Sequence, residues 1–122
     1  MTHSDRFQEF VRACNSRRAA LGLSGWDVTY ECRPMKDAEA ETDANPDGQE
    51  CAITMDRDLP AAKVQGAAVH ELMHVVLSPL AELAKNRFVR SEELEREEER
   101  VVCLLASYIR WLEIGHEKRG NK

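Results

Sequence analysis

The spacing of hydrophobic residues predicts that the chain begins with an amphipathic helix. Apolar residues near the N-terminus recur every three or four positions, as they do on one face of an α-helix, while most arginines fall elsewhere. This apolar face consists of Phe7, Phe10, Val11, Cys14 and Leu21. Gly22 and Gly25 interrupt the pattern, so we expect the helix to end near Gly22.

Three segments then alternate between apolar and polar residues, which is typical of half-buried β-strands. The apolar side of the first segment is formed by Trp26, Val28, Tyr30 and Cys32. The second lies within residues 38–43 and the third within residues 51–55, and the turn sequence NPDG at residues 45–48 separates them. We therefore expect a hairpin within a small, mostly antiparallel three-stranded sheet.

A strongly apolar helix is predicted for residues 61–77. Asp58 and Pro60 precede this segment and favour a helix start. Apolar residues occupy so many of its positions that the helix must be buried on most sides. We expect Ser78 and Pro79 to end it, because proline disrupts a helix interior.

A long final helix is predicted from Ser91, which can cap it, to about Gly115. Its inner stripe is expected to run through Leu94, Val101, Leu105, Tyr108 and Leu112. Residues 116–122 are charged, and we expect them to form a frayed tail. Both tryptophans, Trp26 and Trp111, are expected to anchor the core.

These elements predict an α+β fold in a single domain spanning residues 1–122: a helix, a small sheet, a buried helix and a long closing helix. The 22 acidic residues outnumber the 17 basic ones, which argues against a nucleic acid as partner. The acidic residues around the predicted hairpin are expected to form a solvated face.

The chain has no long apolar stretch, and its first ten residues include Asp5, Arg6 and Glu9 where a signal peptide would be apolar. We therefore expect a cytoplasmic protein without a membrane partner. None of the four cysteines forms a C-x-x-C pair, so reduced thiols are expected rather than disulfides.

The candidate metal-binding and catalytic residues lie in the predicted buried helix, which contains the motif His70-Glu71-x-x-His74. Histidines four residues apart project from the same helix face and can direct two imidazole nitrogens at one ion. Zinc accepts neutral imidazole, and a catalytic zinc site needs three protein ligands and an open position. Glu71 lies about 100° further around the helix, so it is placed beside the metal as a general base.

The apolar setting of this motif strengthens the interpretation. Residues 67–77 are otherwise apolar, and an interior penalises polar groups that lack partners. One metal ion would satisfy the two imidazoles and the carboxylate at once. The alternative is that His70, Glu71 and His74 only form hydrogen bonds to neighbours or meet water at the helix edge.

The third ligand is expected among the glutamates of the final helix. Glu98 lies four residues after Leu94 and three before Val101, which places it within the predicted inner stripe. Glu97 is the alternative if the helix phase is wrong by one residue. The other glutamates are expected on a solvated face: Glu92, Glu93, Glu95 and Glu99.

In residues 69–80 and 97–106 the chain resembles the compact gluzincin-like metallopeptidases, especially the small HExxH proteins of phages and bacterial mobile elements. The resemblance implies a zincin-like minimal domain that hydrolyses protein or peptide substrates. It implies one Zn²⁺ per chain bound by His70, His74 and Glu98, with Glu71 as the general base. Larger gluzincins have an acid four residues after the glutamate ligand, where this chain has Val102, so the groups that orient the histidines stay unassigned.

Two other hypotheses remain open at this point: a non-catalytic metal-binding module with a structural or regulatory role in protein interaction, and a chance motif without metal. For a peptidase, we expect the substrate to add as a strand beside residues 51–55. The candidates for stabilising the developing oxyanion are Tyr30, Arg90, Tyr108 and His116.

Overall fold

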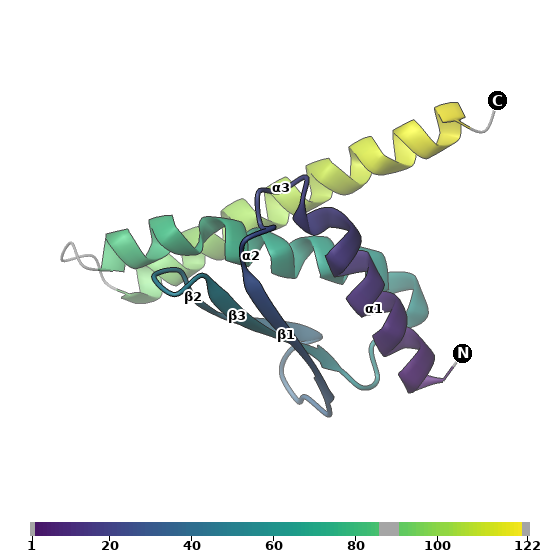
Figure 1. Ribbon diagram of the computed structural model, residues 1–122, viewed down its shortest axis with the longest axis horizontal. Coiled ribbons are helices and arrows are strands. Elements are labelled where there is room, and N and C mark those ends of the chain that lie inside the picture. The colour runs from purple at the N-terminus through teal and green to yellow at the C-terminus, as the bar shows by residue number, and fades with distance from the viewer. Residues whose placement is uncertain (1, 86–90, 121–122) are drawn as a thin grey trace.

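The computed structural model describes residues 2–85 and 91–120. In chain order the elements are α1 (His3–Arg18), β1 (Asp27–Arg33), β2 (Ala40–Asn45), β3 (Glu50–Asp56), the 3-10 turn η1 (Ala61–Lys63), α2 (Val64–Lys85) and α3 (Ser91–Gly120). Helix α2 crosses above the sheet and contacts α1, β2 and α3 (Figure 1). The predicted α+β class and the order of elements are confirmed.

The N-terminal helix begins and ends with local capping contacts. The hydroxyl of Thr2 accepts a hydrogen bond from the Asp5 amide, and the Asp5 carboxylate accepts one from the Thr2 amide. At the other end the Leu23 amide donates to the Arg18 carbonyl and the Gly22 amide donates to the Ala19 carbonyl. The helix ends at Arg18, four residues before the end predicted near Gly22. Gly22 lies in the turn that follows, with a φ of 75° that only glycine adopts without strain.

The sheet has the order β1-β3-β2, with β3 in the centre. The predicted hairpin is confirmed because β2 pairs antiparallel with β3. However, β1 pairs with β3 in parallel, so the sheet is mixed and the prediction of a mostly antiparallel sheet is wrong. Strand β3 is the most buried of the three, which favours its central position between two half-buried edge strands.

The central position of β3 also overturns the predicted substrate edge. Residues 51–55 are paired with β1 on one side and with β2 on the other. No backbone groups of this segment remain for an added strand, because both neighbours already use them. The two edges of the sheet are instead β1 and β2.

The main core joins α1, β3 and α2. Phe10, Ile53, Met55, Leu72 and Val75 are fully buried there, so the three elements hide their apolar faces against one another. Trp26 belongs to this core, as predicted.

All four cysteines are free thiols, also as predicted. Within residues 2–85 and 91–120 the structure has no helix with the length and apolar character needed to cross a bilayer.

Helix α2 continues through Pro79 to Lys85, so the predicted stop at Ser78-Pro79 is wrong. Proline has no amide hydrogen, and the Val75 carbonyl therefore loses its normal partner four residues later. The Ser78 hydroxyl donates a hydrogen bond to that carbonyl at 2.7 Å. This side-chain donor replaces the missing backbone donor and allows the helix to continue.

We expect Ser78→Ala to destabilise the chain by about 1 kcal/mol, because the partly buried Val75 carbonyl then lacks a donor. Urea unfolding measures the change. In a Pro79→Ala background the alanine amide can bond to the same carbonyl, so the same substitution should cost much less. An equal cost in both backgrounds would contradict this explanation.

Helix α3 contacts the body through a different face from the one predicted. Val102 and Ala106 are buried against Val69 and Met73 of α2. The predicted stripe is therefore wrong in phase, since Leu105, Tyr108 and Leu112 are exposed. The helix also extends to Gly120, beyond the predicted end near Gly115. The cap expected from the Ser91 side chain lies outside the described residues.

Candidate metal centre

Helix α2 places the two histidines of the motif on one face, one turn apart. The ring centroids of His70 and His74 are 5.1 Å apart, with an angle of 64° between the ring planes. Both side chains are partly buried where α2 meets α3. The predicted pairing of the two imidazoles is therefore present in the structure.

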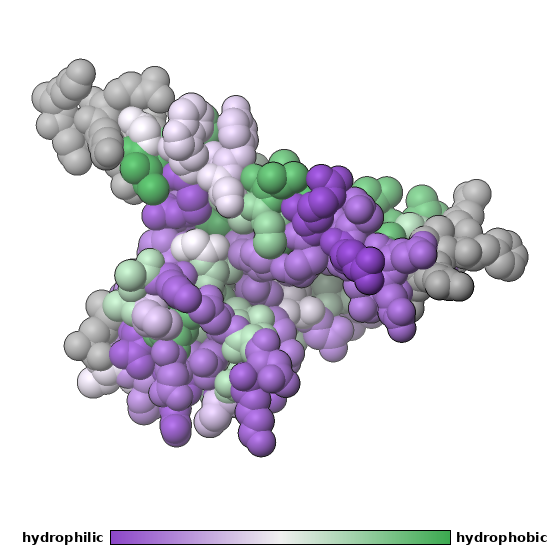
Figure 2. All heavy atoms as spheres, turned by 180° about the vertical axis from the view of Figure 1, so that it is seen from behind, coloured by the Kyte–Doolittle hydropathy of each residue, from purple (hydrophilic) through white to green (hydrophobic). Residues whose placement is uncertain are grey.

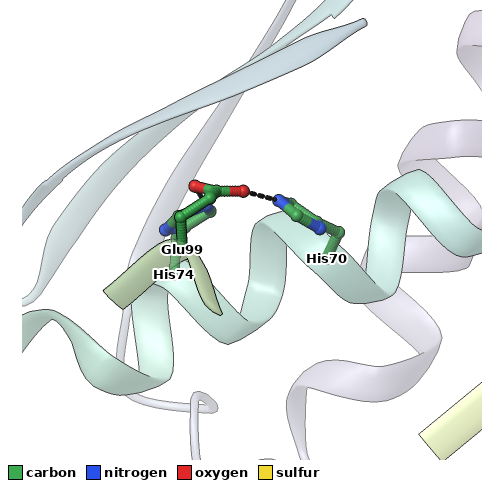
Figure 3. A group of neighbouring side chains, drawn as sticks. All are labelled: His70, His74 and Glu99. Atoms are coloured by element: carbon green, nitrogen blue, oxygen red, sulfur yellow. Dashed lines mark ion pairs between the residues drawn. The ribbon is translucent and has the colours of Figure 1, made fainter. Parts of the chain in front are cut away.

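A glutamate from α3 lies against both rings. The Oε1 atom of Glu99 is 2.7 Å from Nε2 of His70, and its Oε2 atom is 3.1 Å from Nε2 of His74. Figure 3 shows the carboxylate between the two imidazoles. The three side chains offer one ligand atom each within 4.8 Å of one another. Two consecutive helices, α2 and α3, thus contribute donors to one cluster.

The predicted third ligand, Glu98, lies on the other side of His74. Its Oε2 atom is 2.6 Å from Nδ1 of that ring, and its side chain is 20% exposed against 52% for Glu99. A carboxylate at Nδ1 favours the tautomer with its proton there, which leaves the Nε2 lone pair free for a metal. Glu98 therefore lies beside His74, but at Nδ1 and not at the Nε2 that Glu99 approaches.

The alternative third ligand, Glu97, lies outside the cluster. Its carboxylate is exposed and accepts a hydrogen bond from Nε of Arg100 at 3.0 Å. This pair, three residues apart on one helix, is the solvated ion pair that the sequence analysis expected for most of these glutamates.

The donor set fits a divalent transition metal. Two imidazole nitrogens and one carboxylate are preferred zinc ligands, and three protein donors leave a position for water. Atoms bound to one tetrahedral zinc ion are separated by about 3.3 Å, given bonds of about 2.0 to 2.2 Å. Oε1 of Glu99 is 2.7 Å from Nε2 of His70, Oε2 is 3.1 Å from Nε2 of His74, and one ligand atom from each of the three residues lies within 4.8 Å of the other two. Small side-chain adjustments would therefore accommodate an ion.

Glu71 points from the same helix toward β2. Its side chain is 5% exposed, and Oε1 accepts a hydrogen bond from the Thr42 hydroxyl at 2.8 Å. Burial raises the pKa of the Glu71 carboxyl, and the Thr42 hydrogen bond and the two imidazoles oppose that shift. A buried carboxyl with a raised pKa, held beside a candidate metal site, is suited to taking and releasing a proton.

The cluster lies in an open cleft between β2 and the helices. A hollow of about 450 Å³ is bounded by Ala40 and Thr42 on one wall and by His70, Glu71 and Glu99 on the other. A second hollow of about 550 Å³ shares Ala40 and the same three charged or titratable residues. The candidate donors and Glu71 therefore face space that can admit an extended ligand.

Of the predicted oxyanion donors, the two whose side chains the structure describes, Tyr30 and Tyr108, are not in this cleft. The Tyr30 hydroxyl donates to Asn15 of α1 at 2.7 Å, and Tyr108 stacks on Trp111 at the far end of α3. Neither lines the two hollows. Arg90 and the side chain of His116 lie outside the described residues.

Sequence reasoning missed two residues of the site, Glu99 and Thr42. Glu99 was assigned to the solvated face because the stripe was placed one residue out of phase; a phase based on Val102 and Ala106 brings both Glu98 and Glu99 toward α2. Thr42 is the polar member of an otherwise apolar inward face with Ala40 and Ala44. A polar residue in that position needs a partner, which was the available signal.

Comparisons with known proteins gave no match: no family model fits the chain, and neither a curated protein nor a solved structure is similar to it. The likeness to gluzincin-like metallopeptidases therefore rests on the motif residues alone.

Proposed function

We propose that this protein is a zinc-dependent metallopeptidase. The observation that supports this best is the convergence of His70, His74 and Glu99 beside the buried carboxyl of Glu71, at the wall of an open cleft. The direct test is hydrolysis of a disordered protein substrate by the zinc-loaded chain. Zinc bound at one per chain without any hydrolysis would instead favour the non-catalytic metal-binding module.

In this proposal His70, His74 and Glu99 hold the metal, and Glu98 orients the His74 ring through Nδ1. A zinc ion, when bound, supplies Lewis acidity and lowers the pKa of a coordinated water. Glu71 accepts the proton of the attacking water at Oε2, while Thr42 holds Oε1. The same carboxyl then donates the proton to the leaving amine, which burial favours by raising its pKa.

The substrate is proposed to pair with β2, the sheet edge that borders the cleft. Strand β2 pairs with β3 on one side only, so its other side can receive an extended peptide. Backbone pairing there would carry the peptide past His70 and Glu71. This replaces the edge at residues 51–55 that the sequence analysis expected.

Peptide binding to a Glu71→Gln variant, which stops turnover, should slow amide hydrogen exchange in residues 40–45. Strand β1 is the internal control, because it is the other sheet edge and does not border the cleft containing the histidines. Protection confined to β1, with none in β2, would rule out strand addition at β2.

The roles of the three neighbouring glutamates are separated by Glu97→Gln, Glu98→Gln and Glu99→Gln. We expect Glu99→Gln to weaken zinc binding most, Glu98→Gln by about 10- to 100-fold as for a ligand-orienting residue, and Glu97→Gln not at all. Competition with a zinc-sensitive dye measures the three affinities. A larger loss for Glu98→Gln than for Glu99→Gln would make Glu98 the third ligand, as the sequence predicts.

A further inference from the structure

The C-terminal half of α3 has a large exposed apolar face. Tyr108 is 58% exposed, Trp111 is 68% exposed, and their rings stack with centroids 6.1 Å apart. Trp111 is therefore not the core anchor that the sequence analysis expected. The exposed large hydrophobic residues of this face are Leu104, Leu105, Tyr108, Trp111, Leu112 and Ile114. Hydrophobic and weakly polar side chains cover the arm formed by this part of α3 (Figure 2).

This face carries no charge. None of the exposed side chains in residues 101–115, all within the described part of the chain, is acidic or basic. The two charged residues of the segment, Arg110 and Glu113, are only partly exposed. Glu113 accepts hydrogen bonds from Arg17 of α1 at 2.8 and 2.9 Å and from Arg110 at 2.6 Å. These contacts fix the rotation of α3, so the apolar face is held away from α1.

The size of the face matches what a stable homodimer needs. From the exposed fractions of the six residues, it amounts to about 600 Å² of apolar surface, at the upper limit for a patch on a soluble monomer. Two such faces would together bury about 1,200 Å², the lower bound of specific protein interfaces. In a monomer the apolar face of α3 stays exposed to water.

The spacing within the face fits packing against another helix. Leu105, Tyr108 and Leu112 follow each other at intervals of three and four residues, which is the spacing of a helix–helix seam. The N-terminal half of α3 is strongly acidic and would repel a copy of itself. The contact is therefore confined to the C-terminal half.

We propose that this face docks a second copy of the same chain through a two-fold-symmetric α3–α3 contact. In such a dimer each apolar face packs against an identical face, which is also uncharged and has the same length and residue spacing. The inference goes beyond the proposed function and does not depend on metal. It leaves His70, His74 and Glu99 free, because they lie where the other half of α3 meets α2.

The test is sedimentation equilibrium of the full chain over a wide range of concentrations. We expect the wild type to approach twice the mass of one chain, 13.9 kDa. Tyr108→Glu and Trp111→Glu should each raise the dissociation constant by about 100-fold or more, because a buried charge would face an apolar partner. Leu83→Glu is the matched control, since Leu83 is similarly exposed but lies on α2, and it should leave the association unchanged.

Tryptophan fluorescence gives an independent reading on the unmodified chain. Trp26 is already buried, so only Trp111 should become protected from iodide quenching as the concentration rises. A mass of one chain at every concentration with Trp111 fully quenched would overturn the proposal. So would a dimer that persists unchanged in both glutamate variants, or a face that binds phosphatidylcholine vesicles but never a second chain.

Discussion

Replacing Glu71 by glutamine should abolish peptide hydrolysis and leave zinc bound. The glutamine amide keeps the size of the side chain and can still accept the Thr42 hydrogen bond through its oxygen, but it cannot take a proton. We expect kcat to fall by about 100- to 10,000-fold, the usual contribution of a general base. Hydrolysis of a disordered protein and zinc content, measured on the same preparation, report the two properties separately.

Glu95→Gln is the control for this substitution. Glu95 lines the same cleft but is exposed, so loss of its charge should change the activity little. If Glu71→Gln retains wild-type activity, Glu71 is not the base. If it loses zinc as completely as a histidine variant does, Glu71 is a ligand, and the assignment of roles is wrong.

Removing either histidine should eliminate tight zinc binding. His74→Ala and His70→Ala each remove one of only three protein donors, and we expect affinity to fall by more than the 10- to 100-fold typical of ligand-orienting residues. Bound metal stabilises the folded state by RT ln(1 + [Zn]/Kd). Chelation should therefore lower the Tm of the wild type but leave the Tm of either variant unchanged.

His3→Ala is the matched control, because His3 is exposed on α1 and remote from the motif. The His3→Ala variant should bind zinc as the wild type does, and chelation should lower its Tm by the same amount. A wild-type Tm that is insensitive to chelation would support the chance-motif hypothesis. Equal zinc affinity in the wild type and in His74→Ala would place the metal elsewhere.

Local patterns allowed much of the fold to be predicted. The alternation around the NPDG turn identified the β2–β3 hairpin, and Gly22 marked the turn after the first helix, which ends four residues earlier at Arg18. Sheet order was not predictable in the same way, because alternation identifies a strand but not its neighbour. Strand β1 pairs in parallel with β3 although β2 lies between them in the sequence, and such long-range pairing leaves no local pattern.

The histidines and Glu71 were placed correctly on α2 because a four-residue spacing is independent of the rest of the fold. Placing the third carboxylate needed the rotation of α3, and that rotation is set by Val102, Ala106 and the Arg17–Glu113 pair. Leu105, Tyr108 and Leu112 are exposed although their helical spacing is that of a buried stripe, so the apolar pattern alone indicates the wrong rotation. Their exposure is what the proposed dimer would remove.

The most direct test of the proposed zinc site is anomalous X-ray diffraction at the zinc edge from crystals of the zinc-loaded protein. We expect one strong peak per chain within bonding distance of Nε2 of His70, Nε2 of His74 and a carboxylate of α3, with Glu99 as the donor. Crystals soaked in excess zinc that show no peak between these residues would contradict the proposed site.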